Sequence, residues 1–233
     1  MSTSDDLYAR YGPIYRWLVT TAALLAFFVM VFASSMVNVA IPDVMGTFGV
    51  GQDKAQFLTS AFLATTVASL LANTWLIARF GQPIIFQACI IIFVIGSFIS
   101  TFSPTLDMII FGRIVQGFGA GVIQPLIMVL LFDIFPADKR GIAMGFFSMG
   151  VGFALGLAPA LGGVVVDLLG WRYVFLIPIP VALLSLVLGV FFIPERKSRG
   201  PAGKFDYLGY ALMCSFVFCL MTILGNGQRW GWA

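Results

Sequence analysis

One basic residue lies in the middle of a long apolar stretch of this chain, within the run Gly112-Arg113-Ile114-Val115-Gln116-Gly117-Phe118-Gly119-Ala120-Gly121. The stretch around it, Met108 to Phe132, is long enough to cross a bilayer. A charged side chain at the centre of a membrane-spanning helix costs about 2.5 to 3.5 kcal/mol on insertion scales, so such residues usually have a function. Arg113 is therefore the first candidate functional residue.

The composition of the chain indicates lipid rather than water as its solvent. Hydrophobic residues make up 60% of the 233 positions and charged residues only 10%, which is too apolar for one soluble core. Lipid offers no partner to unpaired backbone groups, and the period-two alternation of barrel strands is missing. We therefore expect an all-α membrane protein with seven spans, near Trp17 to Pro42, Ala55 to Ala78, Pro83 to Phe102, Met108 to Phe132, Gly141 to Leu168, Tyr173 to Ile193 and Tyr207 to Leu224.

The basic residues predict which end of each span faces the cytoplasm. Nine lie before the first span or in the loops after the second, fourth and sixth, whereas three lie on the opposite side. Because cytoplasmic loops carry the excess of Lys and Arg, we expect a multi-pass protein of the cell membrane with a cytoplasmic N-terminus. The nine are Arg10, Arg16, Arg79, Lys139, Arg140, Arg196, Lys197, Arg199 and Lys204, and the three are Lys54, Arg172 and Arg229.

The loops divide the chain into four segments. Residues 1–16 form a cytoplasmic N-terminal segment, and residues 17–193 form a six-helix transmembrane bundle with short connections. Residues 194–206 are charged and contain Gly and Pro, which predicts a cytoplasmic linker. Residues 207–233 would hold a seventh transmembrane helix and its outer end.

The polar residues argue against several classes of function. The chain has no histidine, and Cys89, Cys214 and Cys219 all lie in apolar spans. No thiol pair, carboxylate cluster or nucleophile with a base has the spacing of a metal site or a catalytic site. We therefore predict no metal, no cofactor and no enzymatic activity, and we expect membrane lipids rather than nucleic acid as partners.

Small residues are concentrated in the fifth predicted span. They recur at four-residue spacing around a proline, which allows two helix backbones to pack closely and favours a bend. The alternative is that these small residues serve helix packing alone. The candidate hinge and packing residues are Gly152, Gly156, Pro159, Gly162 and Gly163, and the candidate packing residues of the fourth span are Gly117 and Gly119.

These stretches resemble motifs of one transporter family. The run Arg113 to Ala120 resembles the fourth-span motif of the major facilitator superfamily. The run Ala158-Pro159-Ala160-Leu161-Gly162-Gly163 resembles the fifth-span motif of its drug antiporters, with Ala158 in place of a glycine. The runs Ser35 to Pro42, Gly170 to Phe175 and Phe205 to Gly209 resemble the fourteen-span branch of proton-driven multidrug exporters. The resemblance implies a six-helix N-terminal bundle of this superfamily plus a seventh transmembrane helix.

The resemblance also implies functions for the polar residues of the spans. It associates Arg113 with proton coupling, and Gln116 lies one helical turn away on the same face. A guanidinium does not release a proton at neutral pH, so Arg113 would tune a carboxylate or a polar cluster. The alternative is that Arg113 only braces Gln116 and neighbouring backbone carbonyls. We expect Asn38, Gln116 and Gln124 to line a substrate cavity, although helix–helix contact is an equal alternative for Asn38.

The chain departs from the family pattern at its acidic positions. Relatives of this branch usually carry an aspartate in the first span, where this chain has Ala33. In the family's cytoplasmic gating loop, this chain retains Arg79 and Gly81, but Ala78 replaces the aspartate, and Gln82 with Pro83 replaces the basic pair. Losing the acid removes a salt-bridge partner, so we expect looser gating.

The protonatable group of an antiporter is also missing from the predicted spans. No Asp or Glu lies deep in any of the seven, and the nearest ones, Asp133 and Asp167, lie at span edges. A proton antiporter needs a group that binds and releases a proton in the physiological range. Either a second half of the transporter supplies this group, or transport is coupled differently or not at all.

We therefore expect a secondary active transporter, or half of one, that exports amphipathic or hydrophobic organic solutes by proton-coupled antiport. Alternating access in this fold uses two six-helix halves, and this chain has one half plus one span. We expect a truncated or split product whose second half is supplied by a second copy of the chain or by a partner half-transporter. The alternative is a non-transporting or split membrane subunit that needs a partner chain.

Overall fold

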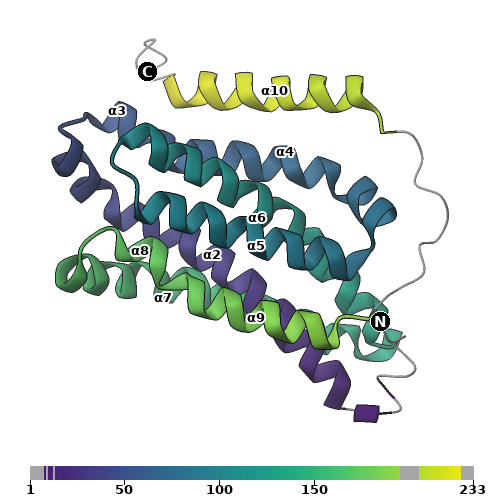
Figure 1. Ribbon diagram of the computed structural model, residues 1–233. Helices are drawn as coiled ribbons and strands as arrows, with labels where there is room; N and C mark the ends of the chain where they lie inside the picture. Colours follow the sequence, from purple (N-terminus) through teal and green to yellow (C-terminus); the bar gives the residue numbers. More distant parts are fainter. Residues whose placement is uncertain (1–7, 9, 13, 195–204, 227–233) are drawn as a thin grey trace.

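The computed structural model describes residues 8, 10–12, 14–194 and 205–226, which form helices and short connections without a strand (Figure 1). The basic linker residues and the terminal Arg229, Trp230 and Trp232 lie outside these ranges. The described elements are α2 (Ile14–Phe48), α3 (Gln52–Ala55), α4 (Phe57–Phe80), α5 (Gln82–Thr101), α6 (Leu106–Ile134), the 3-10 turn η1 (Ala137–Lys139), α7 (Arg140–Leu169), α8 (Tyr173–Leu176), α9 (Pro178–Phe192) and α10 (Tyr207–Asn226).

Six helical segments in this part of the chain are long and apolar enough to cross a membrane. Each holds an 18-residue window that is strongly apolar, and the apolar portion of α10 is shorter, covering Tyr207–Leu220. The predicted fold class, a six-helix bundle followed by a seventh helix, is therefore confirmed. The division into four segments stays a prediction, because most of the predicted linker lies outside the described ranges.

Prolines affect these helices in different ways. Helix α2 continues through Pro42 to Phe48, beyond the predicted end of the first span, and α7 continues through Pro159. The sixth span is instead divided at Ile177 into α8 and α9, immediately before Pro178. Proline lacks the backbone N–H that a helix interior requires, and it disfavours helical geometry in the preceding residue, which accounts for the division there.

Helix α6 lies between α4 and α5, whereas α2 packs against α7 and α9 (Figure 1). The core consists of two apolar clusters. The larger gathers side chains of α2, α5, α6 and α9, and the smaller joins the second half of α2 to α7 and α8. Because α6 is enclosed on two sides, 61% of its most apolar window is buried, against 22% for the α3–α4 segment and 17% for the η1–α7 segment.

The glycines of α6 determine how closely its neighbours approach. A Cβ atom added to Gly117 would lie 2.5 Å from the carbonyl oxygen of Phe62 in α4. On the other side, a Cβ atom added to Gly119 would lie 2.5 Å from the carbonyl oxygen of Cys89 in α5. Backbone therefore touches backbone on both sides of α6, which only residues without a side chain permit.

We predict that Gly119→Ala destabilises the protein by about 1–3 kcal/mol, because the methyl group would force α5 and α6 apart. The matched control is Gly152→Ala in α7, where no atom lies within 4 Å of the added Cβ. Gly152→Ala should leave the stability unchanged or raise it by about 0.5–1 kcal/mol, because alanine lowers the backbone entropy of the unfolded chain. Thermal unfolding of the purified variants in detergent measures both, and equal Tm values would refute the close approach.

Candidate functional site

The Arg113 side chain is fully buried between α4 and α6. Its Nε donates a hydrogen bond to the backbone oxygen of Leu58 in α4 over 3.0 Å. Its Nη1 donates to Oε1 of Gln116, one turn further along α6, over 2.9 Å. The guanidinium also lies over the ring of Phe62, with Cζ 4.0 Å from the ring centroid. Three uncharged groups from two helices thus surround the cation.

A hydrogen-bonded chain continues from Arg113 into α5. Nε2 of Gln116 donates to Oγ of Ser97 over 2.7 Å, and that hydroxyl donates to the backbone oxygen of Phe93 over 3.0 Å. Gln116 and Ser97 are both fully buried. This series of hydrogen bonds links α4, α6 and α5 at the centre of the bundle. Its bonds to the charged guanidinium stabilise the protein more than bonds between neutral groups do.

One nitrogen of the guanidinium remains without an acceptor. Nη2 of Arg113 is buried and has no hydrogen-bond partner among the described residues, and the same is true of Oγ of Ser100 in α5. A buried donor without a partner costs about 1–3 kcal/mol, more when it is charged. Nη2 is therefore the guanidinium nitrogen whose hydrogen-bonding capacity the described residues leave unused.

The structure separates the three residues expected to line a cavity. Gln116 is buried, whereas the side chains of Asn38 and Gln124 are exposed. Asn38 accepts a hydrogen bond from the hydroxyl of Thr59 over 2.9 Å, which joins α2 to α4. Asn38 thus makes the helix–helix contact that was its alternative interpretation, while its exposure leaves it available on the bundle surface.

The fifth-span glycines do not share one environment. Gly162 packs against α2, where an added Cβ would lie 3.0 Å from Cγ of Met36. Gly152, Gly156 and Gly163 have no atom within 4 Å of an added Cβ. These three glycines therefore have no packing partner among the described residues. They lie on one face of α7, which is directed away from the rest of the bundle. Pro159 is exposed beside them.

The connection between α4 and α5 makes a polar contact with the end of α6. Gly81 has a positive φ of 83°, which favours glycine, and its N–H donates to the oxygen of Ile77 to end α4. Nε2 of Gln82 donates to Oδ2 of Asp133, at the end of α6, over 3.1 Å. Arg79 is exposed at the last turn of α4. A neutral amide thus holds the α6 carboxylate.

The family model described as Major Facilitator Superfamily matches residues 23–229. The chain belongs to the major facilitator superfamily. Proteins of this family are transporters rather than enzymes, so the predicted family and the predicted lack of enzymatic activity are confirmed, and the chain is a multi-span membrane protein.

Curated major facilitator relatives include proteins named for drug export. The chain is 31% identical over 215 residues to the multidrug export protein EmrB of Haemophilus influenzae, covering 92% of this chain and 42% of that protein. It is equally similar to EmrB of Escherichia coli, with the same coverage. It is also 30% identical over 221 residues to the fatty acid resistance protein FarB of Neisseria gonorrhoeae, covering 95% and 43%. The chain thus spans less than half the length of these relatives.

Solved structures support the fold of the described helices. A partially occluded, inward-open structure of the xylose transporter XylE from E. coli matches with a TM-score of 0.69 and 19% sequence identity. The match covers 78% of this chain and 49% of XylE. At this identity the similarity establishes the arrangement of helices alone.

Three partners of Arg113 and Gln116 were missed by the sequence analysis. The Leu58 carbonyl is a backbone group, which no residue type identifies, and Phe62 is one of 24 phenylalanines. Ser97 carried the clearest indication, because it is one of the few polar residues of the third predicted span, together with Gln87, Ser100 and Thr101.

We predict a graded loss of stability along the hydrogen-bonded chain. Gln116→Met keeps the volume but leaves Nη1 of Arg113 without its acceptor, and should cost about 1.5–3 kcal/mol. Ser97→Ala leaves the neutral, buried Nε2 of Gln116 without its acceptor, and should cost about 1–2 kcal/mol, less than loss of a partner of the charged guanidinium. Unfolding of the purified variants in detergent, induced by urea or by heating, measures which variant loses more stability. A larger loss for Ser97→Ala would contradict the assigned geometry.

Proposed function

We propose that this major facilitator bundle is one half of a proton-coupled exporter of amphipathic or hydrophobic organic solutes. The observation that carries the proposal is the buried, incompletely paired cation Arg113 at the centre of the bundle. The similarity to relatives named multidrug export proteins supports the solute class and the outward direction. The expected partners are protons, the solute and membrane lipids.

The coupling mechanism follows from the contacts of Arg113. The guanidinium stays charged at every physiological pH, so it cannot carry the proton itself. A carboxylate placed against Nη2 would be held in its charged form, and taking up a proton would weaken that ion pair. Because Nε and Nη1 tie the same guanidinium to α4 and Gln116, the change would reach both helices. The described partners of Arg113 are uncharged, so we infer that a second half supplies the carboxylate.

The exposed faces of α4 and α7 support a second half as partner. Most of α7 is exposed although it is apolar, and much of α4 is half-buried. The outward face of α7 contains the three glycines Gly152, Gly156 and Gly163, which have no neighbour within 4 Å of an added Cβ. Close packing of a second six-helix body on these faces would complete the cavity, with Asn38 and Gln124 available to line it. A partner half-transporter could supply both the rest of the cavity and the carboxylate, whereas a second copy of this chain would complete the cavity without adding a carboxylate deep in a predicted span.

The second candidate function is a membrane subunit that does not itself transport. The contacts of Arg113 with a backbone carbonyl and Gln116 favour it, since they are those of a structural brace. The two candidates differ in what Arg113 variants do. If Arg113 is a structural residue of a subunit that does not transport, its variants should impair folding or assembly and the wild-type chain should show no flux. If Arg113 couples transport, its variants should fold and lose the flux of the wild-type chain.

We predict that the full chain, reconstituted in liposomes with an imposed pH gradient, moves a fluorescent lipophilic cation against empty-vesicle controls. Arg113→Ala should reduce this flux at least tenfold, because coupling requires the cation. Gly156→Leu should also reduce flux, while leaving the Tm of the isolated bundle unchanged, since nothing described lies near Gly156.

Two controls make the flux experiment decisive. Circular dichroism and gel filtration establish that each variant is folded, and Gly141→Leu, at another position without a neighbour within 4 Å, is the matched leucine substitution. Full export by folded Arg113→Ala would end the proposal. Absence of flux from the folded wild-type chain, restored by adding a partner half, would identify a split subunit.

We also predict the orientation of the bundle. The α4–α5 and α6–α7 connections lie at the end where α2 begins, and the α2–α3 and α7–α8 connections lie at the other (Figure 1). Single cysteines placed at Lys139 and Lys54 in a cysteine-free background should therefore react from opposite sides. The positive-inside rule makes Lys139 cytoplasmic. Labelling of Lys139→Cys from outside intact cells would reverse the topology.

A further inference from the structure

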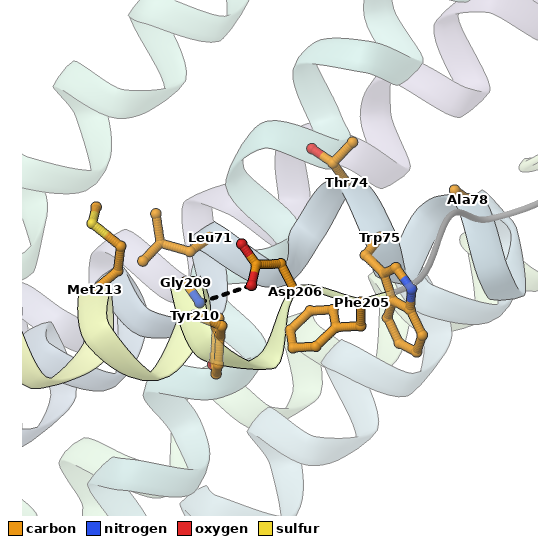
Figure 2. A pocket seen from close by; sticks show the side chains of 9 residues that line it. All are labelled: Leu71, Thr74, Trp75, Ala78, Phe205, Asp206, Gly209, Tyr210 and Met213. Carbon is orange, nitrogen blue, oxygen red and sulfur yellow. Dashed lines mark hydrogen bonds between the residues drawn. The ribbon is translucent and has the colours of Figure 1, made fainter.

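A pocket lies on the outer side of α4, separate from the Arg113 site. It has a volume of about 460 Å³ and is formed by the last turns of α4, the first turns of α10 and the residues just before α10 (Figure 2). Its size falls in the range of small-molecule sites. The described lining residues are Leu71, Thr74, Trp75, Ala78, Phe205, Asp206, Gly209, Tyr210 and Met213.

Three aromatic rings form one wall of this pocket. Trp75 of α4 meets Phe205 edge to face, with centroids 5.0 Å apart, and Phe205 meets Tyr210 of α10 at 5.2 Å. All three side chains are partly exposed. Figure 2 shows them on neighbouring faces of α4 and α10, around the start of α10. Partly exposed rings can present electron-rich faces to a cation.

One carboxylate lies among these rings. Asp206 precedes α10, and its Oδ1 accepts a hydrogen bond from the backbone N–H of Gly209 over 2.8 Å, which caps the helix. The side chain is exposed, and the described lining of the pocket includes no basic residue. The pocket therefore combines aromatic faces with a formal negative charge.

We propose that this pocket binds an organic cation, an ammonium or phosphonium group, carried on an apolar body. The charged group would lie against the Asp206 carboxylate and the faces of Trp75 and Tyr210. The apolar body would lie along Leu71, Ala78 and Met213, which line the same pocket. An anion of the same shape would meet the carboxylate and the negative ring faces, and is rejected.

The placement of the pocket is consistent with a ligand that arrives along the membrane. Helix α10 packs chiefly on α4, at the side of the bundle away from α2, α7 and α9 (Figure 1). The pocket thus opens at the bundle periphery rather than at its centre. Two sources provide the chemistry it recognises, namely a free amphipathic cation and the amine head group of a phospholipid.

Equilibrium binding of radiolabelled tetraphenylphosphonium to the purified full chain in a neutral detergent tests the proposal. The measurement needs no gradient and no flux, so its outcome is independent of the proposed transport function. We expect saturable binding to the wild-type chain and none of tetraphenylborate, which has the same shape and the opposite charge. Asp206→Asn and Trp75→Leu should each weaken binding of the cation by about fivefold.

The variants have matched controls. Asn retains a side-chain oxygen for the Gly209 N–H, so Asp206→Asn removes the charge and keeps the helix cap. Asp107→Asn, in the first turn of α6, removes a charge at the other end of the bundle, and Trp17→Leu removes a partly exposed indole elsewhere. Both controls should bind within about twofold of the wild-type chain, since neither residue lines the pocket.

Competition identifies the source of the cation. Displacement of the probe by phosphatidylethanolamine, but not by phosphatidylglycerol, would support the site with a lipid amine as occupant. Unchanged probe binding in the presence of both lipids would support the site with a free amphipathic cation as occupant. Absence of saturable binding, equal binding of both tetraphenyl ions, or wild-type affinity in folded Asp206→Asn would overturn the proposal.

Discussion

A guanidinium enclosed by apolar helices can be held only if acceptors reach it, and that requirement shapes the centre of this bundle. The Leu58 carbonyl on α4 and the Gln116–Ser97 pair between α6 and α5 must all approach Arg113 closely. The glycines of α6 make this possible, since Gly117 admits the backbone of α4 and Gly119 admits that of α5. The motif around Arg113 therefore places the charge and also brings its partners within reach.

The sequence was sufficient to predict the helices, the membrane, the family and the cation with Gln116, because apolar length and an intramembrane charge depend on residue type alone. It could not identify the Leu58 carbonyl, since a backbone acceptor has no residue signature. Glycines also look alike in sequence. Gly119 packs against the backbone of α5, whereas no described atom lies within 4 Å of a Cβ added at Gly156. The difference depends only on which helix lies next to each glycine.

The connection between α4 and α5 is joined to the end of α6 by a neutral amide. Gln82 stands where the resemblance to the family places a basic residue, and its amide donates a hydrogen bond to Asp133 at the end of α6. A neutral donor to a carboxylate is weaker than an ion pair and is less screened by salt. The contact that joins the start of α5 to the end of α6 therefore contributes less electrostatic energy than an ion pair at the same place would.

Helix α4 takes part in both sites, and the two have opposite charges. Near its start, Leu58 and Phe62 contact the buried cation Arg113, and near its end, Trp75 and Ala78 line the pocket that holds the Asp206 carboxylate. The resemblance to the family places an acid at Ala78, and in this chain the carboxylate that lines the same pocket is Asp206, the residue just before α10. Because α4 is one continuous helix of 24 residues, a rigid displacement by a ligand at its end would move the Leu58 acceptor as well. The energy available to such a displacement is limited to the difference in ligand affinity between the two positions of the helix.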